Sequence, residues 1–331
     1  MEDIIGNEAK KEILDDFFKA IKKYDEFAEY LKNTNLSPNL TVLLYGPPGT
    51  GKTSLTRGFA KKYNIPICVV EADRLVSPLL GDTIKNIRGV VELAGDISKE
   101  RGAFILFFDE IDAIGSERSN IHEVGEIKRA VISFLQVIDR INYEGVPLAI
   151  FGATNHQRQL DSAIWRRFTF HFKFEFPNYH LRKKIIEVFI NKIKNAKIGV
   201  DNSISSKLNS EYKEIQLLSK KLEVKLGRIV SEFDDNFLWG EFNKNKKLKG
   251  LLQLTYGYSG SDIERGTRVA LLKSINTRLL TYDNFYQSLK LVGGTAIHVE
   301  RQDYLSSARD FNGKLRNSEV TKGNLPSPPE I

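Results

Sequence analysis

The sequence has a single cysteine, and no apolar run in it approaches the length of a membrane span. The lone Cys68 excludes an internal disulfide framework and leaves no cysteine cluster that could bind zinc. A membrane-spanning helix needs about 18 consecutive apolar residues. Residues 1–5 lack the basic start and apolar stretch of a secretion signal. We therefore expect a soluble, cytoplasmic protein that does not enter the membrane.

The sequence also lacks a strong charge imbalance and internal repeats. Its 331 residues have a formal net charge of +7, and the lysines and arginines are spread through the expected helices. This balance permits a nucleic-acid partner but does not indicate one. A hydrophobic content of 41% is enough to fill a core. At about 150 residues per domain, the length predicts two domains.

A glycine-rich segment lies between a predicted strand, residues 42–45, and a predicted helix that begins near residue 54. It fits G-x-x-x-x-G-K-T, the Walker A pattern, in the strand–loop–helix context that a P-loop requires. Its backbone N–H groups and the helix N-terminus can bind phosphate oxygens. The alternative, a tight turn with an incidental lysine, is disfavoured by this context. The predicted nucleotide-binding residues are Gly46, Pro47, Pro48, Gly49, Thr50, Gly51, Lys52, Thr53 and Ser54.

A second apolar run ends in a pair of acids. Residues 104–108 are all apolar, which predicts a strand buried on both faces of a sheet. Asp109 and Glu110 follow at its carboxyl end, where ligands bind in parallel sheets. Carboxylates there are costly without a cation. We therefore predict that Asp109 and Thr53 hold Mg²⁺ and that Glu110 polarises the attacking water.

The two motifs together resemble the AAA family of ATPases, within the AAA+ class. Residues 149–155 resemble the family's sensor-1 strand, which ends in a polar residue, here Asn155. Residues 160–168 resemble the second region of homology, whose paired arginines are here Arg166 and Arg167.

The last motif of the resemblance is the start of the sensor-2 helix. Residues 256–263 are similar to it, and Gly260 fits the clade of the family that has no sensor-2 arginine. The motifs follow in the family's order over roughly residues 3–290. The resemblance implies a single-module ATPase that uses ATP and Mg²⁺.

The resemblance also implies a fold and its division. We expect an α/β core over residues 1–177, with a P-loop NTPase parallel sheet flanked by helices. A small α-helical lid is expected over residues 178–292. A polar tail, residues 293–331, follows and ends in a proline-rich stretch that cannot be helical.

Site roles follow from the same resemblance. Lys52 and Asn155 orient the γ-phosphate and the water, and Gly260 lies near the nucleotide. The paired arginines reach the nucleotide of a neighbouring subunit, so that activity depends on a ring, which the resemblance implies is a hexamer. In the family, the backbone near Ile5 and Gly6 lies against the adenine. The alternative for these two residues is a turn that enters the following helix.

Two loops depart from the family's pattern or extend it. The first pore loop of the family usually has an aromatic residue that grips a polypeptide, but residues 78–80 read Pro-Leu-Leu. These residues either form an apolar step or pack between subunits. Residues 115–126 are polar and contain glycine, which predicts a loop, a candidate second pore loop.

The lid contains an insertion at about residues 195–250. Apolar residues recur in it at helical spacing from Leu208 to Phe233, which predicts one amphipathic helix. This helix either packs on the lid or forms an arm that docks a partner, and we favour the arm. The lysines within residues 244–249 predict a solvated face.

Phenylalanine alternates with other residues along residues 168–176. This period of two predicts a strand with one aromatic face. A base-stacking platform would need these rings exposed, and we favour a core strand.

The leading hypothesis is an ATPase that remodels a protein partner. A nucleic-acid-associated motor or loader is one alternative, and a slow, nucleotide-gated scaffold that regulates a partner enzyme is another. We expect no substrate-recruiting domain before Ile4. Recognition is therefore expected in the insertion, in the tail or in a separate protein.

Overall fold

The computed structural model describes residues 6, 8–32, 34, 39–77, 81–115, 121–226 and 250–295. The chain divides into two compact units. The first contains the chain up to Pro47 together with Gly51–Glu175, and the second contains Pro48–Thr50 and the chain from Phe176 onward. No helix in the described part of the chain is both long enough and apolar enough to span a membrane.

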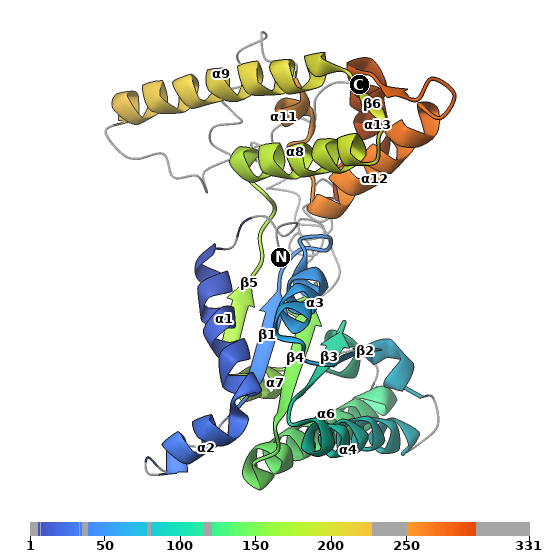
Figure 1. The fold of residues 1–331 in the computed structure, drawn as a ribbon. Helices are drawn as coiled ribbons and strands as arrows, with labels where there is room; N and C mark the ends of the chain where they lie inside the picture. Colours follow the sequence, from blue (N-terminus) through green and yellow to red (C-terminus); the bar gives the residue numbers. More distant parts are fainter. Residues whose placement is uncertain are drawn as a thin grey trace. The chain divides into compact units, whose positions relative to one another are not determined.

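A five-stranded parallel sheet forms the centre of the first unit (Figure 1). The strands are β1 (Thr41–Tyr45), β2 (Ile67–Glu71), β3 (Phe104–Asp109), β4 (Leu148–Thr154) and β5 (Phe170–Lys173). Their order in the sheet is β2-β3-β4-β1-β5, and every neighbouring pair is parallel. This topology confirms the predicted α/β fold with a parallel sheet.

Helices flank the sheet of the first unit, as predicted. They are α1 (Glu8–Lys22), α2 (Tyr24–Lys32), α3 (Lys52–Tyr63), the 3₁₀ helix η1 (Ala72–Leu75), α4 (Asp82–Arg101), α5 (Asp112–Gly115), α6 (Ile121–Glu144) and α7 (Ser162–Arg167). The carboxyl ends of β1 and β3 lead directly into the segments that contain the two phosphate-site motifs.

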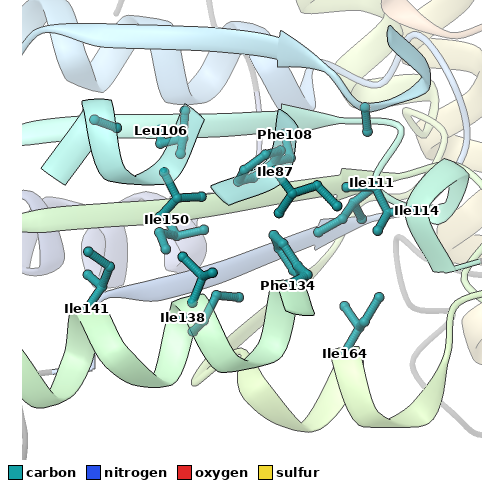
Figure 2. Packing of buried hydrophobic residues seen from close by; sticks show 14 of the residues in the cluster. Ile87, Leu106, Phe108, Ile111, Ile114, Phe134, Ile138, Ile141, Ile150 and Ile164 are labelled. Atoms are coloured by element: carbon teal, nitrogen blue, oxygen red, sulfur yellow. The ribbon is translucent and has the colours of Figure 1, made fainter. Parts of the chain in front are cut away.

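Each face of the sheet buries its own hydrophobic cluster. Successive side chains of a strand point to opposite faces, and every residue of β3 except the last is buried. Phe108 of β3 therefore joins the cluster under α4 and α6, where it meets the ring of Phe134 edge-on at 5.3 Å (Figure 2). Its neighbour Phe107 joins the cluster under α1 and α3. The apolar run was thus correctly predicted as a strand buried on both sides.

The alternating aromatic segment is a core strand at the edge of the sheet. Phe172 and Phe174 are buried in the cluster under α1 and α3, and Phe168 is buried in the cluster on the opposite face. Phe168 points the other way because it precedes β5 and caps the end of α7. These buried rings confirm the core prediction and exclude a base-stacking platform at these three positions.

The segment before α6 differs from its prediction. Residues 115–126 were expected to be a loop, but α6 begins at Ile121. Polar composition does not prevent a helix, and the one glycine within its first turns costs only about 1 kcal/mol relative to alanine. Residues 116–120 lie outside the described residues, as do residues 78–80 of the first pore loop.

The second unit is mainly helical. Its elements are α8 (Tyr179–Asn195), α9 (Asn202–Leu226), α11 (Leu251–Leu254), α12 (Gly260–Lys273), α13 (Tyr282–Val292) and a short parallel pair of strands, β6 (Gly199–Val200) and β7 (Leu279–Leu280). A third hydrophobic cluster, with residues from each of these helices, forms the core of the described part of this unit.

The insertion helix is a part of this core. Leu208 and Ile215 of α9 are buried in the third cluster. Glu211, between them, accepts hydrogen bonds from the amides of Leu252 (3.0 Å) and Gln253 (2.8 Å) in α11. The favoured prediction of a partner-docking arm is therefore wrong for this part of the helix, because the unit itself covers the apolar stripe. Residues 227–249, with the end of the stripe and the lysines, lie outside the described residues.

Candidate active site

The loop between β1 and α3 needs glycine where it begins and where it enters the helix. Gly46 has a φ of 135°, and a Cβ atom added to it would lie 2.1 Å from the carbonyl oxygen of Phe174. Gly51 has a φ of 94° and caps the N-terminus of α3. Residues other than glycine rarely adopt either of these positive φ angles. The loop leads directly into α3, where Gly51 has no side chain that could cap the N–H groups of the first turn, an arrangement that suits anion binding at a helix end.

Lys52 is the centre of the site. Its side chain is buried, and Nζ donates to the carbonyl oxygens of Gly46 (2.7 Å) and Pro47 (2.9 Å). It also donates to Oδ1 of Asn155 (2.8 Å), which lies 103 positions further along the chain, just after β4. The structure thus brings together the lysine of the first motif and the asparagine of the sensor-1 segment.

Among the described residues, no anion is hydrogen-bonded to Lys52 to balance its charge. Burial lowers the pKa of Lys52 to about 8, and the nearby carboxylates of Asp109 and Asp112 oppose this shift. Its hydrogen-bond acceptors described above are all neutral. A desolvated ammonium group with neutral partners gains free energy when a phosphate binds beside it.

Asp112 is a residue to which sequence reasoning assigned no role. It is the first residue of α5, and one carboxylate oxygen, Oδ1, is buried without a hydrogen-bond partner among the described residues. It lies close enough to Lys52 to affect its pKa. The only feature of the sequence that pointed to a role for Asp112 was its position three residues after Asp109.

Thr53 and Asp109 form a pair that fits Mg²⁺. Oγ1 of Thr53 donates to Oδ2 of Asp109 at 3.2 Å, so the first turn of α3 meets the end of β3. Mg²⁺ in nucleotide sites takes one or two protein oxygens and completes its shell with waters and substrate phosphates. The described residues hold no cluster of three or more His, Cys, Asp or Glu side chains that could form a closed metal cage. A hydroxyl and a carboxylate at the phosphate loop fit the open type of site.

Glu110 has an unusual backbone conformation. Its φ is 53°, in the left-handed region, and its side chain is exposed directly after β3. A residue with a side chain pays about 1–3 kcal/mol for such a conformation, and these residues cluster at functional sites. The geometry leaves the carboxylate accessible to water, as the predicted role requires.

The two arginines at the end of α7 differ in their surroundings. Asp161 caps the start of this helix by accepting a hydrogen bond from the amide of Ala163 (2.6 Å). Arg167 forms an ion pair with Asp139 of α6, with 3.1 Å between Nε and Oδ1. Arg166 is exposed and forms no ion pair with any described residue. Two adjacent arginines cannot point the same way on an extended chain, so the sequence predicts different roles for them, but it does not show which of the two pairs with an acid.

Three other residues, Ile5, Gly6 and Gly260, were predicted to lie near the nucleotide. Ile5 lies outside the described residues, and Gly6 is buried with a φ of 83°. Gly260 is the first residue of α12, next to a capping box that Ser259 and Asp262 form. Their roles at a nucleotide stay predictions.

The comparisons with known proteins point to one family. Residues 42–176 match the family model described as "ATPase family associated with various cellular activities (AAA)". An uncharacterised AAA family ATPase of Sinorhizobium fredii is 34% identical over 204 residues, which cover 62% of this chain and 57% of that protein. The 26S proteasome regulatory subunit 6A of Encephalitozoon cuniculi is 36% identical over 196 residues, which cover 58% and 47%.

One more curated protein and one solved structure are also similar to this chain. The proteasome-activating nucleotidase of Sulfurisphaera tokodaii is 36% identical over 173 residues, which cover 50% of this chain and 42% of that protein. A crystal structure of the FIGL-1 AAA domain in complex with ADP matches with a TM-score of 0.61 at 22% identity, covering 92% of this chain and 87% of that one. The latter supports the fold. The chain spans about half the length of these curated relatives, 42% to 57%.

Proposed function

We propose that the chain is an ATPase of the AAA family, whose model matches residues 42–176, and that it hydrolyses ATP in a hexameric ring and uses the reaction to remodel a protein partner. The observation that supports this best is the buried Lys52 ammonium, held 2.8 Å from Asn155 beside the pair of Thr53 and Asp109. One cation, one amide and a hydroxyl–carboxylate pair are the groups that phosphoryl transfer to water needs.

In the proposed reaction, Lys52 and the loop amides bind the β- and γ-phosphates. Thr53 and Asp109 would hold Mg²⁺, which neutralises phosphate charge when bound. Asn155 keeps Lys52 in place and orients the attacking water. Glu110 accepts a hydrogen bond from this water and polarises it towards the γ-phosphorus.

The domain assignment follows the same proposal. The sheet and its helices, residues 1–177, form the nucleotide-binding core, and the helical part, residues 178–292, serves as the lid. Ile5 and Gly6 lie on the adenine side of the nucleotide, and Gly260 lies near it in the lid. Residues 293–331 form a polar tail.

The ring is proposed from the arginines. Arg166 is exposed and has no ion pair within the described part of its own chain, which supports a role at the nucleotide of the neighbouring subunit. Arg167 pairs with Asp139, so we assign it to hold α7 on α6 and to support Arg166 at the interface. An arginine that acts on the charge developing in the transition state is worth about a thousandfold in turnover or more.

The protein partner is proposed from the relatives. Two of them are by name a proteasome regulatory subunit and a proteasome-activating nucleotidase, which favours a protein partner over nucleic acid. The test is co-purification of proteins with Glu110→Gln, which should retain ATP. Lys52→Ala, which should not bind ATP, is the matched control.

We expect proteins to be recovered with Glu110→Gln in ATP, in amounts that nuclease treatment does not change, and to be absent with Lys52→Ala. Recovery that nuclease abolishes would instead indicate a nucleic-acid motor. Equal recovery in ATP and ADP, together with slow turnover of the wild type, would indicate a nucleotide-gated scaffold.

A further inference from the structure

Three aromatic side chains from different elements meet beside Arg166. The rings of Trp165 in α7 and His171 in β5 are nearly parallel, with centroids 4.6 Å apart and 12° between their planes. The ring of Tyr45, the last residue of β1, meets Trp165 edge-on at 5.0 Å. We call these three residues the aromatic stack.

The sheet register explains why they meet. In the pairing of β1 with β5, His171 lies opposite Leu43, and Lys173 lies opposite Tyr45. His171 and Tyr45 therefore point to one face of the sheet. On that face Leu43 and Ile164 of α7 share one hydrophobic cluster (Figure 2 shows Ile164). The adjacent Trp165 is thereby brought over the ends of the two strands.

The stack also holds the backbone at the end of α7. Nε2 of His171 lies 2.9 Å from the carbonyl oxygen of Trp165, within hydrogen-bonding distance. The same carbonyl accepts the amide of Phe168 (3.3 Å), which closes the helix. The side chain of His171 thus fixes the peptide unit that joins Trp165 to Arg166.

We propose that the aromatic stack positions Arg166 for the nucleotide of the neighbouring subunit. This inference rests on the proposed function, since it requires an arginine that acts in trans. With six residues, α7 is far shorter than a helix that is stable by itself. Its orientation therefore depends on its contacts, which include the buried Ile164, a hydrogen bond from Oγ1 of Thr41 to the carbonyl oxygen of Arg167 (3.0 Å), the ion pair of Arg167 with Asp139 and the stack. Arg166 follows Trp165 directly and has no ion pair of its own within the described residues to orient it.

The substitutions are chosen to separate positioning from folding. His171 is exposed, so His171→Ala removes the stacked ring without opening a cavity in the core. Trp165 packs partly on the hydrophobic cluster, so Trp165→Leu keeps apolar contact and loses the stack, while Trp165→Phe keeps an aromatic ring. Tyr30→Ala, at an exposed aromatic residue of α2, is the matched control.

We expect His171→Ala and Trp165→Leu to lower kcat by about a hundredfold, the effect of misplacing a catalytic group by roughly 1 Å. The KM for ATP and the affinity for an ATP analogue should stay near wild type. Trp165→Phe and Tyr30→Ala should retain most of the activity. Equal losses in Trp165→Leu and Trp165→Phe would contradict a role for the stacked ring.

The deciding experiment mixes full-length subunits. Arg166→Ala subunits have an intact P-loop, and Lys52→Ala subunits have intact arginines, so the mixture should regain part of the activity. When the Lys52→Ala subunit also carries His171→Ala, the mixture should regain little. When the Arg166→Ala subunit carries His171→Ala instead, recovery should remain, because that subunit supplies only its P-loop.

Each outcome has one meaning. Full recovery with His171→Ala in the arginine donor overturns the inference and leaves the proposed function intact. The inference is also overturned if recovery is lost only when the P-loop donor, the Arg166→Ala subunit, carries His171→Ala. The stack would then act through Tyr45 on the phosphate loop of the same subunit. If the simple mixture regains nothing although the subunits co-assemble, the arginines do not act in trans, and both the proposed ring mechanism and the inference fail.

Discussion

At the scale of residues, we expect Lys52 to make the proposed nucleotide binding depend on pH. Burial lowers its pKa to about 8 in the nucleotide-free chain. Bound phosphates favour the ammonium form and raise this pKa again. At pH values above 8 and below the raised pKa, ATP binding therefore takes up a proton, and affinity falls by up to about tenfold per pH unit. Below pH 8, Lys52 is already charged, and affinity should be nearly constant.

Calorimetry in buffers of different ionisation enthalpy measures this proton uptake directly. Lys52→Arg is the matched variant, because arginine stays charged throughout this pH range. It should bind ATP more weakly, since its longer fork does not fit the same acceptors, but without the decline above pH 8. The same decline in Lys52→Arg would show that another group titrates.

The sequence predicted best the residues that belong to short motifs at the start of a helix or the end of a strand. Thr53 and Asp109 were expected to meet because their motifs fix a helix start and a strand end, and the structure brings them to 3.2 Å. A difference between Arg166 and Arg167 was expected, but which of them pairs with an acid could not be predicted. It depends on Asp139, a residue of another helix whose approach only the packing determines.

At the scale of elements, α9 stabilises the second unit through a buried carboxylate. Both oxygens of Glu211 accept amides at the start of α11. Glu211→Ala leaves these buried amides unsatisfied, so we expect the free energy of unfolding of this unit to fall by about 1–3 kcal/mol. Urea unfolding measures the change. Glu214→Ala, at an exposed position of the same helix, is the control and should change it by less than about 0.5 kcal/mol.

The two element predictions that failed did so for different physical reasons. Periodicity in a sequence shows which face of a helix is apolar, but not what covers that face. The stripe of α9 was therefore compatible with a free arm as well as with the unit's own core. For α6, the polar residues before the apolar face were taken for a loop, whereas the helix continues through them because nothing there breaks it.

At the scale of the whole molecule, the proposed active site is one that a single subunit cannot complete. The residues proposed to bind the nucleotide come from a single sheet edge and the adjoining loop, so we expect nucleotide binding to need only one chain; they are Lys52, Thr53, Asp109 and Glu110. The proposed transition-state stabilisation needs Arg166 from a second chain. Binding and hydrolysis should therefore respond differently to dilution.

The most direct test is ATP turnover per subunit over a dilution series, with the assembly state measured at each concentration by sedimentation. We expect turnover per subunit to rise steeply as rings form, while the affinity for an ATP analogue stays constant. In the same series, Glu110→Gln should bind ATP, and its turnover should be lower than that of the wild type by about a hundredfold or more, as expected for a lost general base. Turnover that stays constant while the subunits dissociate, or wild-type turnover in Glu110→Gln, would contradict the account.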